Sequence, residues 1–185
     1  MGRKYADDYR LDNVLTPGGK LKTVPIYCGD WFELELSGAA AAAVKRRYLI
    51  LMITAVVSLL YLLSFTNHMD RSWYVALPAG ISTIFLFFTG CAVWRLWTAN
   101  GPVTREHKDK THDRLAPMSM FSFVLALLCL AGCIYHLIAV RFGALQLLFT
   151  AFSGLYLAST FLMFHGRKAL LMKKSDKPKT QIPDI

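Results

Sequence analysis

Four long apolar stretches constrain the fold of this chain more than any other feature. They cover residues about 48–66, 73–97, 118–140 and 145–165, and each has close to the ~20 apolar residues that an α-helix needs to cross ~30 Å of hydrocarbon. None contains Asp, Glu or Lys, and the single arginine, Arg95, lies near the end of its stretch, where a long side chain can reach the membrane surface. The sequence therefore predicts an all-α integral membrane protein with four transmembrane helices.

The distribution of basic residues predicts how these helices are oriented. Eight Lys and Arg precede the first stretch, five belong to the link between the second and third, and six follow the fourth, whereas the other two links hold one each. Because cytoplasmic loops carry an excess of Lys and Arg, we expect a plasma-membrane protein with both termini in the cytoplasm. The formal net charge of +9 is then a topology signal, which favours anionic lipid headgroups and disfavours nucleic acid as partners.

The chain divides into an N-terminal cytoplasmic segment (1–37), a transmembrane domain (38–166) and a basic cytoplasmic tail (167–185). Within the first segment, the runs KLKTVPIY and WFELEL flank the turn sequence Cys-Gly-Asp, a pattern that predicts a β-hairpin over about 20–36. A lone two-stranded hairpin is only marginally stable in water. Its apolar residues are therefore candidates for docking on a protein partner, on the bundle or on headgroups: Phe32, Leu34 and Leu36.

Small and weakly polar residues recur on one face of the predicted helices. Such residues let helix backbones approach closely inside a membrane, and the short links at 67–72 and 141–144 require antiparallel neighbours. We therefore expect an antiparallel four-helix bundle. Its predicted packing positions are Ser122, Cys129, Gly132, Cys133, Gly154, Gly80 and Gly90.

The octapeptide CLAGCIYH at 129–136 has the residue types of a metal or redox site. On a helix, however, Cys129 and His136 lie about 10 Å apart along the axis, whereas metal–ligand bonds are about 2 Å long. Residues four apart have Cβ atoms about 5–6 Å apart, which is too far for a disulfide between Cys129 and Cys133. We expect free thiols used in packing, with no metal and no cofactor.

His136 remains a candidate functional residue because it lies near the outer end of its helix. Other polar residues are expected at the same depth or in the adjoining outer loops: Gln146, Thr150, Tyr61, His68, Asp70 and Arg141. This predicted outer cluster can be interpreted as an inter-helix hydrogen bond, as a shallow ligand site, or as a haem site with His68 and His136 as axial ligands.

The sequence favours a binding role over catalysis. The leading hypothesis is an accessory subunit or scaffold that binds a protein partner, or a second copy of itself, through its N-terminal segment and bundle. The alternative is an oligomeric transporter or channel lined by hydroxyl, Gln and His side chains, although the apolar stretches lack the carboxylates that ion-coupled carriers use. A membrane-embedded enzyme ranks third, because no nucleophile with a base and no pair of acids is expected at one depth.

Overall fold

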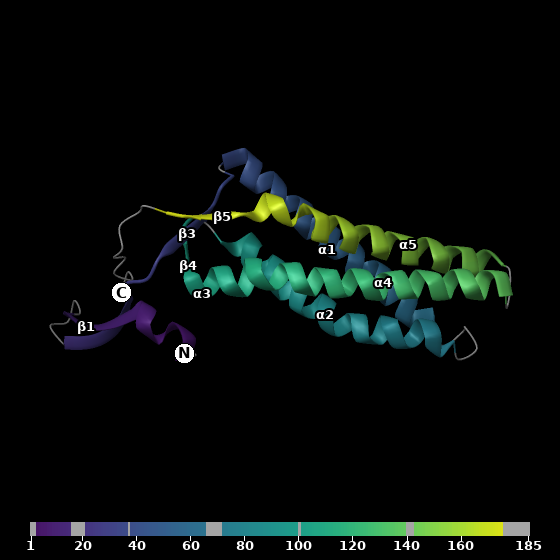
Figure 1. The fold of residues 1–185 in the computed structure, drawn as a ribbon, viewed down its shortest axis with the longest axis horizontal. Helices are drawn as coiled ribbons and strands as arrows, with labels where there is room; N and C mark the ends of the chain where they lie inside the picture. Colours follow the sequence, from purple (N-terminus) through teal and green to yellow (C-terminus); the bar gives the residue numbers. More distant parts are fainter. Residues whose placement is uncertain are drawn as a thin grey trace.

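The computed structural model describes residues 3–15, 21–36, 38–65, 72–99, 101–139 and 143–175. Four long helices lie side by side (Figure 1): α1 (Gly38–Phe65), α2 (Trp73–Thr98), α4 (Arg114–Ala139) and α5 (Ala144–His165). All four are long and apolar enough to cross a membrane, as predicted. α1 begins at Gly38, ahead of the apolar stretch at 48–66, because the alanines after Gly38 are strong helix formers.

The helices form a closed ring in which each packs against two neighbours. α2 lies between α1 and α4, and α5 lies between α4 and α1. Small and polar side chains such as Ser82, Ser122 and Ser153 are buried inside, whereas large apolar ones such as Phe87 and Leu128 face outward. A soluble bundle would do the opposite, so this distribution suits a lipid surround.

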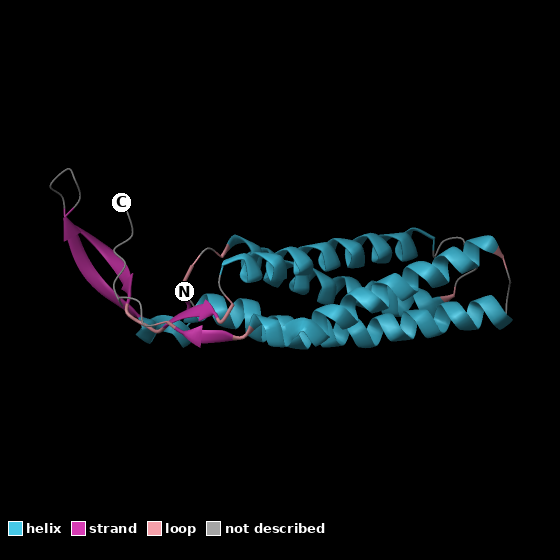
Figure 2. Cartoon of the chain, turned by 90° about the horizontal axis from the view of Figure 1, so that it is seen from above, coloured by secondary structure: helices cyan, strands magenta, loops and turns pink. Residues whose placement is uncertain are grey.

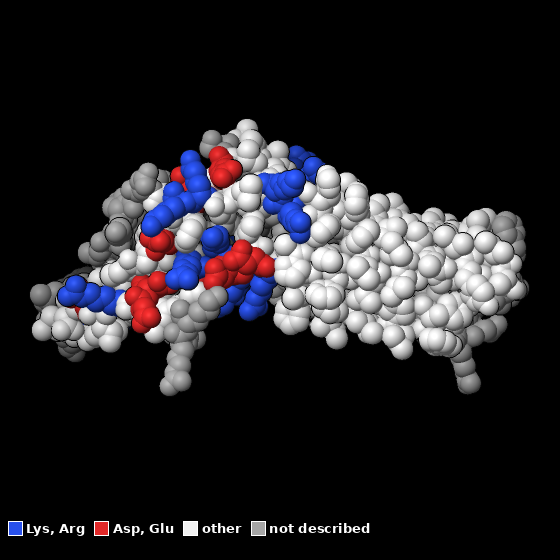
Figure 3. Space-filling model, viewed as in Figure 1, with Lys and Arg blue, Asp and Glu red and all other residues white. Residues whose placement is uncertain are grey.

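Charged residues gather at one end of the bundle (Figure 3), where α1 begins and α2 ends. We call this the charged end and the opposite one, where α2 begins and α4 ends, the far end. The short helix α3 (Arg105–Lys108) and a π-helical turn (Asp109–Asp113) lead into α4 at the charged end. In Figure 3 the bundle surface beyond the charged end shows no Lys, Arg, Asp or Glu among the residues described.

A three-stranded antiparallel sheet joins distant parts of the chain at the charged end. Its central strand β3 (Trp31–Leu34) pairs with β4 (Val103–Thr104) on one edge and with β5 (Met172–Lys174) on the other. β5 follows α5 through a 3₁₀ helix (Gly166–Leu170). The sheet thereby ties the N-terminal segment to the α2–α3 link and to the described part of the predicted basic tail.

The N-terminal segment contains a β-hairpin, as predicted, but its strands differ from the predicted pair. β1 (Tyr9–Leu15), which follows a 3₁₀ helix (Arg3–Asp8), pairs with β2 (Leu21–Tyr27). The connection contains Thr-Pro-Gly-Gly, a strong turn sequence, and allows seven paired positions. The predicted second strand instead supplies β3, both of whose edges are occupied by β4 and β5. Figure 2 shows the hairpin extending away from the bundle.

Candidate functional site

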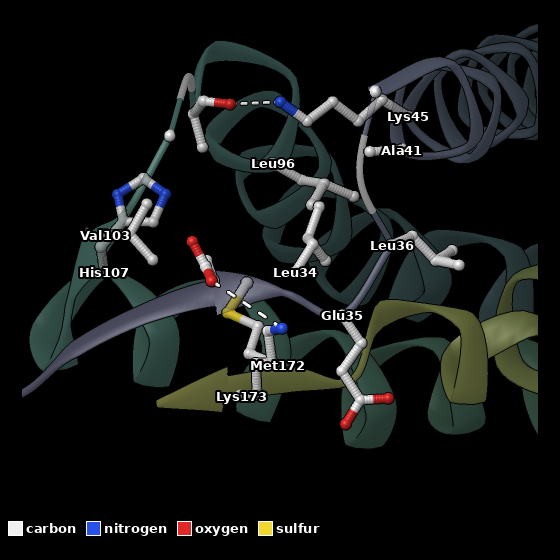
Figure 4. Close-up of a pocket in the computed structure, with 14 residues that line it drawn as sticks. Leu34, Glu35, Leu36, Ala41, Lys45, Leu96, Val103, His107, Met172 and Lys173 are labelled. Atoms are coloured by element: carbon white, nitrogen blue, oxygen red, sulfur yellow. Dashed lines mark hydrogen bonds and ion pairs between the residues drawn. The ribbon is translucent and has the colours of Figure 1, made fainter. Parts of the chain in front are cut away.

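A cavity of about 320 Å³ lies between the three-stranded sheet and the charged end of the bundle. We call it the junction pocket (Figure 4). Leu34, Leu96 and Met172 are among its apolar lining residues, and Lys45, His107 and Lys173 are among the polar ones. It is therefore an amphipathic pocket at the boundary between apolar helices and charged segments.

Ion pairs and capping contacts fix the polar side chains around the junction pocket. The Lys45 amine donates a hydrogen bond to the carbonyl of Ala99, the C-cap residue of α2 (Figure 4). A lysine at this position is favourable because the last carbonyls of a helix lack helical partners and carry partial negative charge. Lys173 on β5 lies 4.0 Å from Glu33, its cross-strand neighbour on β3. This partly exposed pair aids register more than stability.

The base of the β1–β2 hairpin is attached to the helix that leads into α4. The Tyr27 hydroxyl donates to the Asp30 carbonyl at 2.8 Å and accepts from the Arg105 amide at 3.0 Å. Burial raises the pKa of Tyr27, and the Arg105 amide partly offsets that rise. The Tyr5 hydroxyl donates to Asp109 at 3.0 Å. The hairpin base is therefore held on the bundle by two tyrosines, neither of which the sequence reasoning singled out.

The three residues predicted to dock a partner lie on or just after β3. Phe32 carries the Lys108 ammonium 4.3 Å above its ring, a cation–π contact. Leu34 packs against the buried core of the bundle, and Leu36 lines the junction pocket. Phe32 and Leu34 thus contact the rest of the chain, whereas Leu36 is still 36% exposed. The most exposed large apolar side chains among the described residues of the segment are Leu11 and Leu21 of the hairpin, each 71% exposed.

Several side-chain atoms around the hairpin base and charged end are buried without a hydrogen-bond partner among the described residues. They belong to Asp8, Trp31, His107 and Thr111. Buried polar groups are nearly always paired. Four such groups are therefore concentrated at one end of the described structure.

At the far end, the buried imidazole of His136 contacts a residue that the predicted outer cluster did not include. The Tyr74 hydroxyl of α2 lies 2.9 Å from His136 Nδ1. Tyr74 is the second residue of α2 and therefore lies at the same end of the bundle as His136. The pair supports the hydrogen-bond interpretation of His136 between α2 and α4.

The other members of the predicted outer cluster have separate surroundings. Thr150 donates to the Gln146 carbonyl within its own helix, at 2.9 Å. Tyr61 stacks on Phe152 with ring centroids 4.0 Å apart. His68, Asp70 and Arg141 lie outside the described residues, and so does any haem site that uses His68.

The predicted packing positions are only partly at close helix contacts. Ser122, Cys129 and Cys133 are fully buried, and both cysteines are free thiols. A Cβ added at Gly132 would lie 2.9 Å from a Val75 methyl carbon of α2. The other glycines differ from one another: Gly90 adjoins a side chain of α1, whereas Gly80 and Gly154 have open space around them.

The centre of the bundle contains a cluster of buried hydroxyls. Tyr156 of α5 faces Ser82 and Ser122, yet none of these three hydroxyls forms a hydrogen bond of ordinary geometry within the described part of the chain. Within the same described residues, no group of three His, Cys, Asp or Glu side chains is arranged to hold a metal ion.

Comparisons with protein-family models, with curated proteins and with solved structures find no match. Functional inference therefore rests on the geometry of this chain.

Proposed function

We propose that this chain is a membrane-spanning binding protein, an accessory subunit or scaffold that presents its β1–β2 hairpin to a protein partner in the cytoplasm. The exposed apolar face of the hairpin carries the proposal. Leu11 and Leu21 share that face by register, and both are exposed. Because an isolated hairpin is marginal in water, a partner that covers these leucines stabilises it.

The anchored base makes the hairpin suitable for recognition. Tyr27 and Tyr5 fix its base on the bundle, so less conformational freedom is lost on binding than for a free segment. The unpartnered buried groups near this base, such as Trp31 Nε1 and His107 Nε2, further support a surface that a partner completes.

An extended segment of the partner fits this surface by adding a strand to β1. Among the described residues β1 pairs only with β2, so one of its edges is open. Pro25 removes a backbone donor from β2, whereas β1 contains no proline. Main-chain hydrogen bonds to β1 then supply affinity, and apolar side chains over Leu11 and Leu21 supply specificity.

Residue-resolved crosslinking tests this proposal. We expect Leu11→Ser with Leu21→Ser to abolish crosslinks between the hairpin and a co-purifying protein, with thermal stability unchanged. Arg10→Ser with Lys22→Ser is the matched control, because these exposed residues lie on the opposite hairpin face by register. Crosslinks that survive the leucine changes, or that are lost equally in the control, contradict the proposal.

The proposed orientation places the charged end in the cytoplasm, with both termini on that side. It is supported by the excess of basic residues in the segments that meet at this end. Cys28 is exposed beside the hairpin and offers a test in a Cys91→Ala background. A membrane-impermeant maleimide should label Cys28 in inverted vesicles and leave it unlabelled in intact cells, and labelling in intact cells contradicts this orientation.

The hydroxyl cluster favours a second candidate, the oligomeric transporter or channel. Ser82, Ser122 and Tyr156 are buried close together in the bundle, with no hydrogen bond of ordinary geometry among the described residues, and such groups suit a polar pathway that is filled in another conformation. Solute flux in proteoliposomes that drops on Tyr156→Phe supports this candidate. If His136→Ala and Gln146→Ala leave the flux unchanged, the predicted outer cluster plays no part in this pathway.

A further inference from the structure

The surface between α1 and α2 contains an apolar groove of about 540 Å³. α1 contributes side chains from Met52 to Leu63, and α2 contributes side chains from Thr83 to Arg95. We call it the α1–α2 groove. Its size is in the range of cavities that bind small ligands, and Arg95 is the one charged residue among the described residues that line it.

The groove exists because α1 and α2 share the loosest of the four helix–helix interfaces. Leu59 and Leu86 form a buried floor, whereas Leu60, Phe87 and Trp94 are exposed along its length. Gly90 keeps the middle open, since a Cβ there would come within 2.8 Å of the Met52 methyl carbon. The groove therefore has a buried floor and large apolar side chains on its walls.

The position of Arg95 gives the groove a polar end. The lining of α2 from Thr83 to Arg95 covers about 18 Å at 1.5 Å per residue, more than half of a ~30 Å hydrocarbon core. Arg95 lies in the last turn of α2 at the charged end, is exposed, and forms no ion pair with another described residue. An apolar groove of this length that ends in an exposed cation matches one acyl chain and an anionic headgroup.

We propose that the α1–α2 groove holds one acyl chain of an anionic phospholipid, with the lipid phosphate bound by Arg95. A helix from a second copy fits less well. Close helix packing in membranes needs small residues at the contact, whereas Leu60, Phe87 and Trp94 project from this surface. A flexible chain fits between such side chains. The inference rests on the membrane-spanning part of the proposed function and is independent of any partner of the hairpin.

The headgroup, and not the acyl chain, sets the selectivity of this site. Lipid tails are as apolar as leucine, so moving a chain from bulk lipid into the groove changes its surroundings little. One basic residue near an anionic headgroup supplies about a fivefold preference. We therefore expect phosphatidylglycerol to be retained about five times more than phosphatidylcholine with the same chains.

Native mass spectrometry of the full chain tests the site. The protein is purified in mild detergent and equilibrated with equal amounts of the two lipids. Arg95→Gln should bring their retention to parity. Arg47→Gln, which removes an equal charge from an exposed position on α1, should leave the preference unchanged. A preference that survives Arg95→Gln, or that is lost equally with Arg47→Gln, overturns the headgroup assignment.

Filling the groove tests the acyl-chain assignment separately. Gly90→Leu and, independently, Cys91→Phe should abolish retention of both lipids. Gly80→Leu is the matched control, because Gly80 is exposed with open space around it and does not line the groove. The site is overturned if both variants still retain lipid while their unfolding temperatures are unchanged. If the unchanged protein is a dimer and both variants are monomers, a second copy occupies the groove, and the lipid site is overturned as well.

Discussion

Removal of the hydroxyl group should affect the free energy of unfolding differently at two buried tyrosines. Tyr48 and Tyr156 are 1% and 0% exposed. The Tyr48 hydroxyl donates to the Met163 carbonyl at 2.9 Å, whereas the Tyr156 hydroxyl has no hydrogen-bond partner of ordinary geometry among the described residues. Replacing each with phenylalanine removes one oxygen from an equally buried site, so the comparison isolates the hydrogen bond.

The hydrogen-bond partner of Tyr48 sets the size of its effect. Met163 lies in the last turn of α5, where carbonyls lack helical partners. Tyr48→Phe leaves this carbonyl buried and unpaired, which costs about 1–3 kcal/mol. Tyr156→Phe removes a hydroxyl that has no hydrogen bond of ordinary geometry among the described residues, so it should leave the free energy of unfolding unchanged or raise it by about 1 kcal/mol. At about 2–4 °C per kcal/mol for a chain of this size, the two variants should differ in Tm by several degrees.

Thermal unfolding in mild detergent, followed by tryptophan fluorescence, measures this difference. Tyr135→Phe is the control, because Tyr135 is 58% exposed, and it should change Tm little. A Tm that falls as much for Tyr156→Phe as for Tyr48→Phe refutes the reasoning. That result means that the Tyr156 hydroxyl is hydrogen-bonded in the folded protein, to the neighbouring serines that it faces or through water.

Three further predictions concern the helix contacts and the hairpin. Gly132→Ala should destabilise the bundle by about 1–3 kcal/mol in the same melting assay, because the added carbon would lie 2.9 and 3.2 Å from atoms of α2. Gly154→Ala should instead stabilise the bundle by about 0.5–1 kcal/mol, because Gly154 has open space around it. Tyr27→Phe loses two hydrogen bonds and should speed hydrogen exchange in the hairpin tenfold or more, with bundle exchange unchanged. Tyr74→Phe should shift the imidazole ¹⁵N resonance of His136 and cost about 0.6 kcal/mol, and an unchanged resonance argues against their contact.

The helices could be predicted from the sequence because their signal is local. A run of about 20 apolar residues identifies a membrane-spanning helix without reference to the rest of the chain, and the three later helices begin and end within a few residues of the predicted limits. The pairing of the N-terminal strands, by contrast, is not a local property of the sequence. Periodicity identified residues 20–27 and 31–36 as strand-like, but pairing depends on contacts that periodicity does not contain. The partners of β3, two and three residues long, are too short for any pattern.

The candidate site was predictable only to the level of membrane depth. Counting residues placed His136 near the end of its helix, but which side chain contacts it depends on the order and rotation of the helices around the bundle. The same limit applies to the glycines. Gly132 and Gly154 have similar small-residue neighbours in the sequence, yet only Gly132 faces a neighbouring backbone.

Different residues of the N-terminal segment serve partner recognition and bundle stability. β3 is hydrogen-bonded on both edges, and the Glu35 amide also donates to the Leu171 carbonyl. Removing residues 1–36 therefore breaks the sheet that joins the ends of α2 and α5. Any resulting loss of binding then reports damage to the charged end. Leu11 and Leu21 are exposed on the hairpin beyond these contacts. Changes at the two leucines therefore report recognition alone, whereas changes at Tyr27 alter the position of the hairpin on the bundle.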